Sequence, residues 1–303
     1  MRSWRRPRPR STRPPRRQSR TEVRTAPLAY RHAKVQRLRR LISRASARDA
    51  ERAFVLEGPT LLREALDVGA PIEGVYVAPR PAGATDDGPE VAAAWARGLR
   101  VHDLAPGVLE RIAGTTSPQP LLAIVRMIDI DLSTVDTVGR DPRPLVVCAD
   151  VRDPGNLGTV LRSAEAAGAA GVVCCDGTVD VYNPKCVRAS AGALFHVPVV
   201  VGGDPVTVVD RIRAAGRRCL GAAAGQGVAY TDAELSAPLA LVLGNEANGL
   251  PRALDGHLDG LVHIPMEGRS ESINVGMACA VLCFEAARQR RVPLAQSTLA
   301  VTQ

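Results

Sequence analysis

An amide and a guanidinium, Asn156 and Arg162, lie six residues apart in the stretch DPGNLGTVLRSAEAAG, residues 153–168. The two familiar glycine-loop patterns for binding phosphates are absent from it. Gly158 is followed by Thr159 rather than by the Lys of a P-loop, and the spacing is G-x-x-G rather than the G-x-G-x-x-G of a dinucleotide site. A nucleotide-binding kinase or dehydrogenase is therefore disfavoured. A guanidinium suits another task, because its planar fork can bind a phosphate through two hydrogen bonds.

Two more polar loops follow apolar runs in the C-terminal half of the chain. Residues 244–249 (GNEANG) follow LALVL, and residues 265–274 (PMEGRSESIN) follow LVHI. Runs with few polar residues are typical of strands in a parallel sheet that is covered on both faces. Ligands of such sheets bind at the carboxyl ends of the strands. We therefore expect these two loops and residues 153–162 to contribute to ligand binding.

The elements that must position these loops form two α/β domains. Strand-like and helix-like runs alternate in both halves of the chain, which predicts a first domain over residues 28–128 and a second, parallel-sheet domain over residues 144–291. The polar segment 129–143 has no periodic apolar face and is predicted to be a linker. Residues 1–27 and 292–303 are predicted to be terminal tails.

The net charge of +8 is distributed unevenly. Residues 1–48 contain 17 Arg and Lys and one acid, Glu22, so the other 255 residues together have a charge of −8. Residues 1–27 are rich in Arg and Pro with almost no side chains to bury, and we expect them to be disordered. A polyanion, above all RNA, is the expected partner. The alternatives are an inert tail, a misassigned start codon and, disfavoured by its proline content, a mitochondrial transit peptide.

The basic character continues into residues 31–48, which contain no acid. Val35, Leu38, Leu41 and Ile42 have the three-and-four spacing of an amphipathic helix, and cationic side chains occupy its other faces. We expect these cations to contact RNA phosphates, although a solvated helix face is the structural alternative. The residues assigned to this surface are Arg31, Lys34, Arg37, Arg40 and Arg44, and Arg48 is expected on the same faces.

Composition narrows the class of protein further. Aromatic residues make up only 3%, so a stacking surface for single-stranded bases is not expected. No apolar run reaches the ~18 residues of a membrane helix, and the N-terminus lacks the apolar core of a signal peptide, so we expect a cytoplasmic protein. The 7 Cys lie in apolar runs without a C-x-x-C pair, which predicts reduced core residues and no metal site.

The three polar loops resemble, in order, the motifs of the SpoU (TrmH) branch of the SPOUT RNA methyltransferases. The matching stretches are NLGTVLR, LALVLGNEANGL and IPMEGRSESINVGMACAVLCFE. The similarity extends from about residue 30 over nearly the whole chain, because FVLEGPTLLREAL looks like the substrate-binding domain of many members, an α/β fold shared with certain ribosomal proteins. The motif residues that are matched are Asn156, Arg162, Gly244, Glu246, Gly249, Ser272 and Asn274.

The resemblance implies methyl transfer from S-adenosylmethionine to a ribose 2′-hydroxyl of RNA, with large-subunit ribosomal RNA as the expected substrate. It also implies a homodimer and a deep trefoil knot in the second domain. The residues that it assigns to catalysis are Asn156, Arg162, Glu246, Ser272 and Asn274. The residues that it assigns to the cofactor are Leu243, Gly244, Asn245, Gly249, Ile264, Met266, Ser272, Ile273 and Asn274. The apolar helix 275–284 is the expected dimer contact.

Arg162 has two possible roles under this resemblance. It can anchor the phosphate beside the target ribose, or it can accept the proton of the hydroxyl. Anchoring is favoured, because a guanidinium in a protein ordinarily stays protonated. Asn248, Arg269 and Glu271 lie beside the motif residues and are candidates for tuning the choice of substrate.

Most of these residues also have a purely structural interpretation. Asn156 could be only a helix N-cap, Arg162 could pair with Glu165, and Ser272 could cap the last helix. Glu246 could satisfy loop amides or a partner arginine. Outside the motifs, His196 and His263 are expected to be structural histidines whose hydrogen bonds are satisfied. Lys185 and Arg188 are expected to be structural or interfacial.

Two other functions remain as alternatives. The protein could methylate transfer RNA, or it could be a catalytically silent RNA-binding protein on the same fold. The five intact catalytic positions argue against the silent protein, because binding alone gives no chemical reason to retain all of them.

Overall fold

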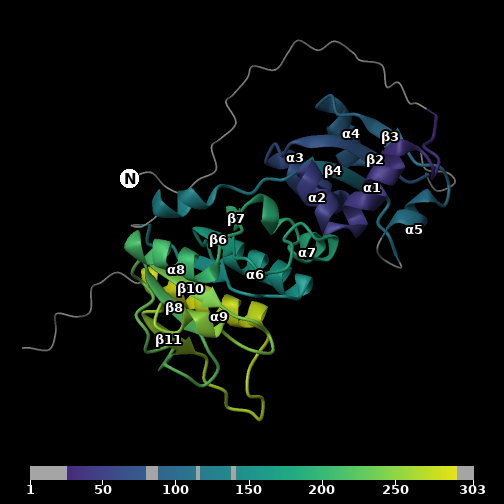
Figure 1. Ribbon diagram of the computed structural model, residues 1–303. Coiled ribbons are helices and arrows are strands. Elements are labelled where there is room, and N and C mark those ends of the chain that lie inside the picture. Colours follow the sequence, from purple (N-terminus) through teal and green to yellow (C-terminus); the bar gives the residue numbers. More distant parts are fainter. Residues whose placement is uncertain (1–25, 80–87, 114–116, 138–140, 292–303) are drawn as a thin grey trace, which may run out of the picture. The chain divides into compact units, whose positions relative to one another are not determined.

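The computed structural model describes residues 26–79, 88–113, 117–137 and 141–291, so most of both predicted tails lies outside the described residues. The chain divides into two units (Figure 1). Of the described residues, the C-terminal unit contains Asp129–Val179 and those from Val197 onward. The N-terminal unit contains the described residues up to Ile128 together with Asp180–His196.

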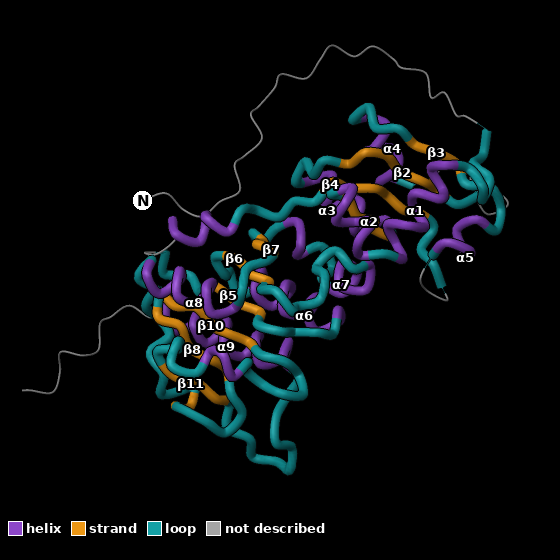
Figure 2. Tube along the Cα trace, in the orientation of Figure 1, coloured by secondary structure: helices purple, strands orange, loops and turns teal. Residues whose placement is uncertain are grey.

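The sheet of the N-terminal unit has four strands: β1 (Ala53–Glu57), β2 (Ile72–Val77), β3 (Val101–Asp103) and β4 (Leu121–Arg126). Their order is β1-β4-β2-β3, and Figure 2 labels the last three of them. β4 is antiparallel to both of its neighbours, and β2 and β3 are parallel. β3 is therefore an edge strand.

Among its described residues, the first part of this unit has five helices: α1 (Ala33–Ser43), α2 (Ala45–Glu51), α3 (Pro59–Asp67), α4 (Pro89–Ala96) and α5 (Val108–Ile112). The apolar stripe predicted for α1 is buried in one core cluster with residues of α5 and the sheet. Pro59 and Pro89 begin their helices, a position where proline costs no hydrogen bond.

The prediction of a single basic helix over residues 31–48 is wrong in one respect, because the helix is interrupted at Arg44. Arg44 has extended backbone angles, φ −131° and ψ 117°, between α1 and α2. Arg48 does not lie on a cationic face, since it is only 3% exposed. Its guanidinium donates to the carbonyls of Leu41 and Ile42, which the end of α1 leaves without helical partners, and it pairs with Asp180 at 2.6 Å.

The segment Asp180–His196 contains α7 (Pro184–Ala189) and the short 3₁₀ helix η2 (Ala193–Phe195). It packs on β1 through aromatic rings, with the ring centroids of Tyr182 and Phe195 at 4.8 and 6.3 Å from that of Phe54.

Besides the Arg48–Asp180 pair, two side-chain contacts join the same segment to the rest of the N-terminal unit. They join Arg188 to Glu57 at 2.9 Å and His196 to Glu64 at 2.8 Å. Arg188 and His196 thus have the structural partners that were expected of them.

The sheet of the C-terminal unit has seven strands: β5 (Leu145–Cys148), β6 (Gly171–Cys174), β7 (Val199–Val201), β8 (Arg218–Ala222), β9 (Val228–Ala229), β10 (Leu239–Leu243) and β11 (Gly260–His263). The order is β7-β6-β5-β10-β8-β11-β9, and every pairing is parallel. The predicted parallel sheet is confirmed.

Helices cover this sheet: α6 (Pro154–Ala166), α8 (Pro205–Ala214), α9 (Val275–Arg291), and the 3₁₀ helices η1 (Leu132–Thr137) and η3 (Arg252–Leu254). One core cluster joins alternate residues of β5 to α8 and to Val135 of η1, so part of the segment predicted as a linker is packed. α6 packs against α9, where a Cβ on Gly276 would come within 2.7 Å of Thr159.

The cysteines are buried in the two units, as expected for core residues, and their thiols are free. Cys148, Cys174, Cys279 and Cys283 interact with one another inside the C-terminal unit. No helix in the described ranges is long and apolar enough to cross a membrane.

Candidate active site

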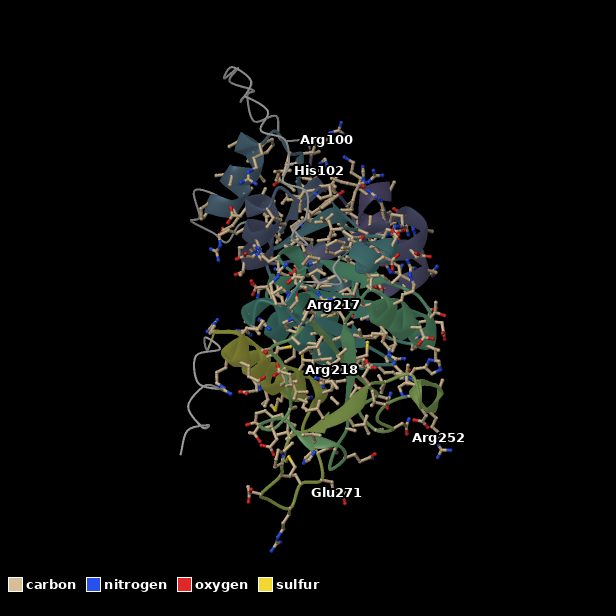
Figure 3. All side chains as sticks on the ribbon, turned by 90° about the vertical axis from the view of Figure 1, so that its left-hand side faces the viewer. Arg100, His102, Arg217, Arg218, Arg252 and Glu271 are labelled. Atoms are coloured by element: carbon tan, nitrogen blue, oxygen red, sulfur yellow. The ribbon has the colours of Figure 1, made fainter. Side chains whose placement is uncertain are left out.

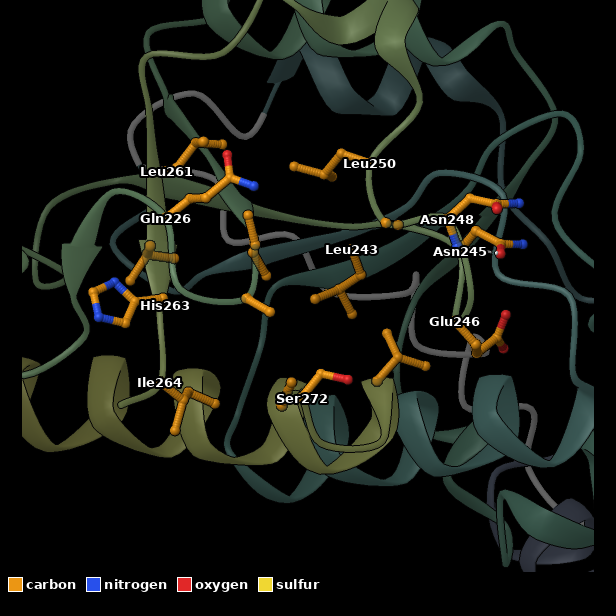
Figure 4. Close-up of a pocket in the computed structure, with 18 of the residues that line it drawn as sticks. Gln226, Leu243, Asn245, Glu246, Asn248, Leu250, Leu261, His263, Ile264 and Ser272 are labelled. Atoms are coloured by element: carbon orange, nitrogen blue, oxygen red, sulfur yellow. Dashed lines mark hydrogen bonds between the residues drawn. The ribbon is translucent and has the colours of Figure 1, made fainter. Parts of the chain in front are cut away.

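A cavity of ≈ 750 Å³ opens at the carboxyl edge of the sheet in the C-terminal unit (Figure 4). Its walls come from the loops that follow β8, β10 and β11, from the first turn of α6 and from α9. Such a position follows from the topology, because loops at the carboxyl ends of adjacent parallel strands meet at one edge.

A chain of side-chain hydrogen bonds joins three of the loops at this cavity. Asn156 donates from Nδ2 to Glu246 Oε1 at 2.9 Å, and Asn274 donates from Nδ2 to Asn156 Oδ1 at 2.7 Å. Glu246 also accepts from the backbone N–H groups of Arg152 and Asp153, at 3.2 and 3.1 Å. The loops after β5, β10 and β11 are therefore fixed to one another by polar groups whose partners are already in place.

The charge of Glu246 is stabilised by this arrangement. Burial raises the pKa of Glu246, but the hydrogen bonds from Asn156 and from backbone N–H groups outweigh it and leave the pKa below its ordinary value. Glu246 is thus a carboxylate engaged by several donors, which suits a role in positioning more than a role as a proton acceptor.

The loop after β10 closes on itself tightly. Asn245 and Gly249 exchange two backbone hydrogen bonds of 2.8 and 2.9 Å, and Asn245 Oδ1 accepts from the N–H groups of Ala247 and Asn248. A Cβ on Gly244 would come within 2.3 Å of the backbone of Gly249, so the loop requires glycine at position 244.

The loop after β5 is held in an unusual backbone conformation. Asp150 has φ +72°, which is uncommon for a residue with a side chain, and its carbonyl accepts from Asn245 Nδ2 at 3.1 Å. Its carboxylate pairs with Arg152 at 2.8 Å. Backbone outliers of this kind are concentrated at functional sites. Asp150 was not predicted as a site residue.

The capping interpretations of two motif residues are wrong. The N-cap of α6 is Asp153, whose Oδ1 accepts from the N–H of Asn156, so the side chain of Asn156 is free for its contacts between loops. At the start of α9 it is Asn274, not Ser272, whose side chain accepts from Gly276 N–H at 2.8 Å. Glu246, in contrast, does satisfy two loop amides, as its structural interpretation expected.

The predicted site residues fall into two groups. Those brought together in the wall of the cavity include every residue assigned to the cofactor, and Asn156 and Glu246. These are Leu243, Gly244, Asn245, Gly249, Ile264, Met266, Ser272, Ile273, Asn274, Asn156 and Glu246. Their roles in binding and catalysis stay predictions.

Arg162 lies apart from this wall. It is exposed on α6, and its side chain makes no ion pair or hydrogen bond with the described residues, so the alternative interpretation, a pair with Glu165, is not observed. An exposed guanidinium without a carboxylate beside it remains available for an external anion.

The cavity also includes residues that the sequence did not indicate. The loop after β8 contributes Ala222, Ala223, Ala224 and Gln226, and the alanines offer no polar side chain that could have marked them. His263 lines the cavity as well. The expectation that His263 is a satisfied histidine is wrong, since its buried Nδ1 has no hydrogen-bond partner in the described part of the chain.

The cationic residues predicted on the basic helix differ in whether a carboxylate pairs with them. Arg37 is held by Glu51 and Glu73 at 2.5 and 2.6 Å, and Arg40 lies 3.5 Å from Glu51. Glu51 and Glu73 lie outside residues 31–48, so carboxylates are present on the surface of a helix whose own sequence contains none. Arg31 and Arg44 are exposed and form no ion pair with the described residues.

Two family models match the chain. Residues 143–284 match the SpoU rRNA methylase family, and residues 32–123 match the MRM3-like substrate binding domain.

Individual relatives agree with these models. A 23S rRNA guanosine-2′-O-methyltransferase of Bacillus subtilis is 32% identical over 76% of this chain and 87% of its own. A 23S rRNA uridine-2′-O-methyltransferase of Streptomyces viridochromogenes is 30% identical over 87% of this chain and 92% of its own.

A solved structure supports the same relationship. The crystal structure of an rRNA methyltransferase from Sinorhizobium meliloti, bound to S-adenosylmethionine, superposes with a TM-score of 0.74 at 31% identity, covering 85% of this chain and 95% of the other. With all of its matched motif residues except Arg162 gathered at one cavity, and with its similarity to these relatives over most of their length, this chain belongs to the SpoU rRNA methylase family.

Proposed function

We propose that the protein transfers a methyl group from S-adenosylmethionine to a ribose 2′-hydroxyl of large-subunit ribosomal RNA. The observation that carries the proposal is the joining of the loops after β5, β10 and β11 at one cavity through Glu246, Asn156 and Asn274. A purely structural network would not need to face a cavity of ligand size.

The cavity fits the cofactor in size and chemistry. Small-molecule sites typically have volumes of about 300–1,000 Å³, and this one has ≈ 750 Å³. The apolar side chains of Leu243, Ile264 and Met266 suit the adenine ring, and the glycine at position 244 leaves backbone groups open to a ligand. No group of His, Cys, Asp and Glu in the described residues could form a metal site.

The chemistry explains why polar positioning groups are sufficient. Bound S-adenosylmethionine supplies an electrophilic methyl group on a positively charged sulfur. The site therefore needs a correctly positioned nucleophile and a shaped cavity rather than a strong acid. Glu246, Asn156 and Asn274 fix the loops that shape this cavity. Arg162 anchors the phosphate beside the target ribose, which orients the 2′-hydroxyl.

The substrate class follows from the relatives, and the target nucleotide does not. The two relatives act on a guanosine and on a uridine of 23S rRNA, so membership of the family does not select one base. Ribosomal RNA is favoured over transfer RNA by both names and by the MRM3-like substrate binding domain. The cytoplasm, where ribosomal RNA is made and modified in bacteria, is the corresponding location.

A homodimer through α9 is part of the proposal. Met277 is 61% exposed and Phe284 is 48% exposed, and their seven-residue spacing places them on the same side of the helix. Large apolar side chains at this exposure are typical of interfaces. Sedimentation of full-length Met277→Asp tests it, with Val201→Asp, at a position 45% exposed, as the control. We expect the wild type and the control to be dimers and the variant to dissociate; a monomeric wild type at micromolar concentration would contradict the proposal.

The activity is tested with ribosomal RNA from a strain that lacks the gene. We expect labelled S-adenosylmethionine to transfer one methyl group to a 2′-oxygen of the large-subunit RNA, at a position that is unmodified in that strain. Transfer RNA from the same strain is the comparison. Methylation of transfer RNA alone would support the alternative substrate, and cofactor binding without methylation of either RNA would contradict the proposed enzyme.

A further inference from the structure

The start of α1 and the edge strand β3 form a cationic cluster in the N-terminal unit that the proposed methyl transfer does not use. Lys34 donates from Nζ to His102 Nε2 at 2.9 Å. Arg100 directly precedes β3, two residues before His102, and the two residues are labelled near each other in Figure 3. His32, the N-cap of α1, accepts from the N–H of Lys34 through Nδ1. We call Lys34, Arg100, His32 and His102 the β3 cluster.

His102 is the unusual member of the β3 cluster. It is only 8% exposed, and its Nδ1 is buried without a hydrogen-bond partner in the described residues. An ammonium can only donate, so Nε2 must accept from Lys34 and the proton of the neutral ring must be on Nδ1. A buried donor without an acceptor is rare and calls for an explanation. Holding the charge of Lys34 in place is such an explanation.

The charges of the β3 cluster act on one another. Burial lowers the pKa of His102, and the charges of Lys34, Arg100 and His32 lower it further, while Asp103 acts in the opposite direction. His102 therefore stays neutral at physiological pH and remains an acceptor for Lys34. Arg100 is exposed and forms no ion pair with any described residue.

The β3 cluster differs from Arg37 and Arg40 of α1 in this respect. Arg37 pairs with Glu51 and Glu73, and Arg40 lies 3.5 Å from Glu51. Lys34 uses one of its three donors on a neutral ring, and Arg100 uses none on the described residues. Uncompensated cations gathered around a positioned ammonium fit a phosphodiester, which is anionic at any physiological pH.

We propose that Lys34, Arg100 and His32 bind backbone phosphates of the substrate RNA, and that His102 positions Lys34 for this contact. The proposal rests on the proposed function, since it assumes that RNA is the substrate. The β3 cluster lies within residues 32–123, which match a substrate binding domain. Contacts to phosphates fix the position of the RNA and contribute affinity, while the choice of nucleotide comes from other contacts.

The test is binding of ribosomal RNA by the full-length protein across a salt series, with Lys34→Gln, Arg100→Gln and the double variant. The control is Arg39→Gln, which removes one exposed charge of the same helix that has no ion pair to the described residues. At about 0.15 M salt we expect each lost contact to weaken binding by about 5-fold, and the double variant by on the order of 20-fold. The slope of log K against log salt should fall by about 0.7 to 0.9 for each lost contact.

The role of His102 needs a separate readout. His102→Phe removes the acceptor without changing the charge, and we expect about the same loss of affinity as in Lys34→Gln. His102→Gln restores an acceptor and should recover most of the affinity. Equal affinity in the two His102 variants, both folded by thermal melting, would contradict the positioning role.

The outcomes separate the two proposals. If the wild type methylates the RNA but the double variant binds with the affinity and salt slope of Arg39→Gln, the β3 cluster is not an RNA site. If the wild type neither binds nor methylates any ribosomal RNA, the proposed function itself fails. A variant that binds bare RNA normally but binds ribosomal particles poorly would indicate a protein partner instead, which also overturns the proposal.

Discussion

The cavity loops and the β3 cluster differ in whether their polar side chains already have partners within the protein. At the cavity, Glu246 accepts from three donors and Asn156 both donates and accepts, so the groups are satisfied before any ligand arrives. In the β3 cluster, Arg100 has no partner among the described residues and Lys34 has one neutral partner. Positions that must be accurate are fixed by mutual hydrogen bonds, and charges that must meet a polyanion are left uncompensated.

The difference has an energetic basis. A site that orients a reacting group gains from rigid, preorganised contacts, because their ordering is complete before the reaction. Binding of RNA gains mainly from the release of counterions, which depends on free charge more than on exact geometry. Substitutions at the cavity should therefore act on cofactor binding or on rate, and substitutions in the β3 cluster should act on affinity and on its salt dependence.

Arg162 provides the strongest challenge to this division, because it is an unpaired cation in the catalytic motif. We expect Arg162→Ala to reduce methylation at least about 100-fold, the usual loss for one essential electrostatic contact, while cofactor affinity changes by no more than a few-fold. Titration calorimetry with the cofactor and a methylation assay measure the two effects. Glu165→Gln, on the exposed side of the same helix, is the control. Loss of cofactor binding as complete as the loss of activity would move Arg162 to the cofactor side.

Gly244 tests whether the cavity loops depend on exact geometry. In Gly244→Ala the new Cβ would come within 2.3 Å of the Gly249 backbone, so the loop must open. We expect cofactor affinity to fall at least about tenfold, because the backbone that lines the cavity moves. Gly268→Ala is the matched control, since a Cβ there meets nothing within 4 Å. Equal affinities in the two variants would show that the loop tolerates displacement.

A substitution of Glu246 tests whether its negative charge is needed to hold the cavity loops together. Glu246→Gln keeps the shape but replaces an acceptor by a donor opposite the N–H groups of Arg152 and Asp153. We expect a loss of about 1 kcal/mol in the free energy of unfolding, a modest value because the residue is exposed. Urea unfolding measures it, with Glu267→Gln as an exposed control. No difference between the two variants would make the network energetically unimportant.

The pH dependence of Glu246 has a definite sign. Its pKa is lower in the folded protein than its ordinary value, so the contribution to stability is complete above the ordinary carboxyl pKa of about 4.3. It is lost as the pH falls through the lowered value in the folded state. The difference in unfolding free energy between wild type and Glu246→Gln should therefore shrink on acidification, and a difference that grows toward low pH would contradict the assignment.

The sequence predicted the regular part of the fold well. The parallel sheet followed from apolar runs bounded by turns, and the cavity loops followed from polar residues after those runs. The loop after β8 could not be predicted in this way, because Ala222, Ala223 and Ala224 line the cavity without polar side chains.

Long-range pairs account for most of what the sequence missed. Nothing local shows that Arg48 leaves the helix surface to meet Asp180, or that residues 180–196 cover β1. The break at Arg44 has no Gly or Pro to mark it. The homodimer and the knot that the family resemblance implies stay predictions.

Substitution of Arg37 is expected to have the smallest effect on RNA binding, and Arg37 contrasts most clearly with the β3 cluster. It lies on the same helix as Lys34 and was expected to bind RNA, yet Glu51 and Glu73 compensate its charge at 2.5 and 2.6 Å. Burial lowers the pKa of Arg37, but the two carboxylates outweigh it and raise the pKa, so the ion pairs persist over the whole physiological range.

Removing Arg37 should consequently change stability more than binding. We expect Arg37→Gln to cost no more than about 1 kcal/mol in unfolding free energy, as for other partly exposed ion pairs. The dissociation constant for ribosomal RNA should stay within about twofold of wild type and the salt slope should not change, because a cation already paired with carboxylates releases few counterions from RNA. The same salt series with Lys34→Gln is the comparison. A fall in slope as large as that of Lys34→Gln would mean that RNA displaces the carboxylates, and that free charge in the unbound protein does not identify the phosphate contacts.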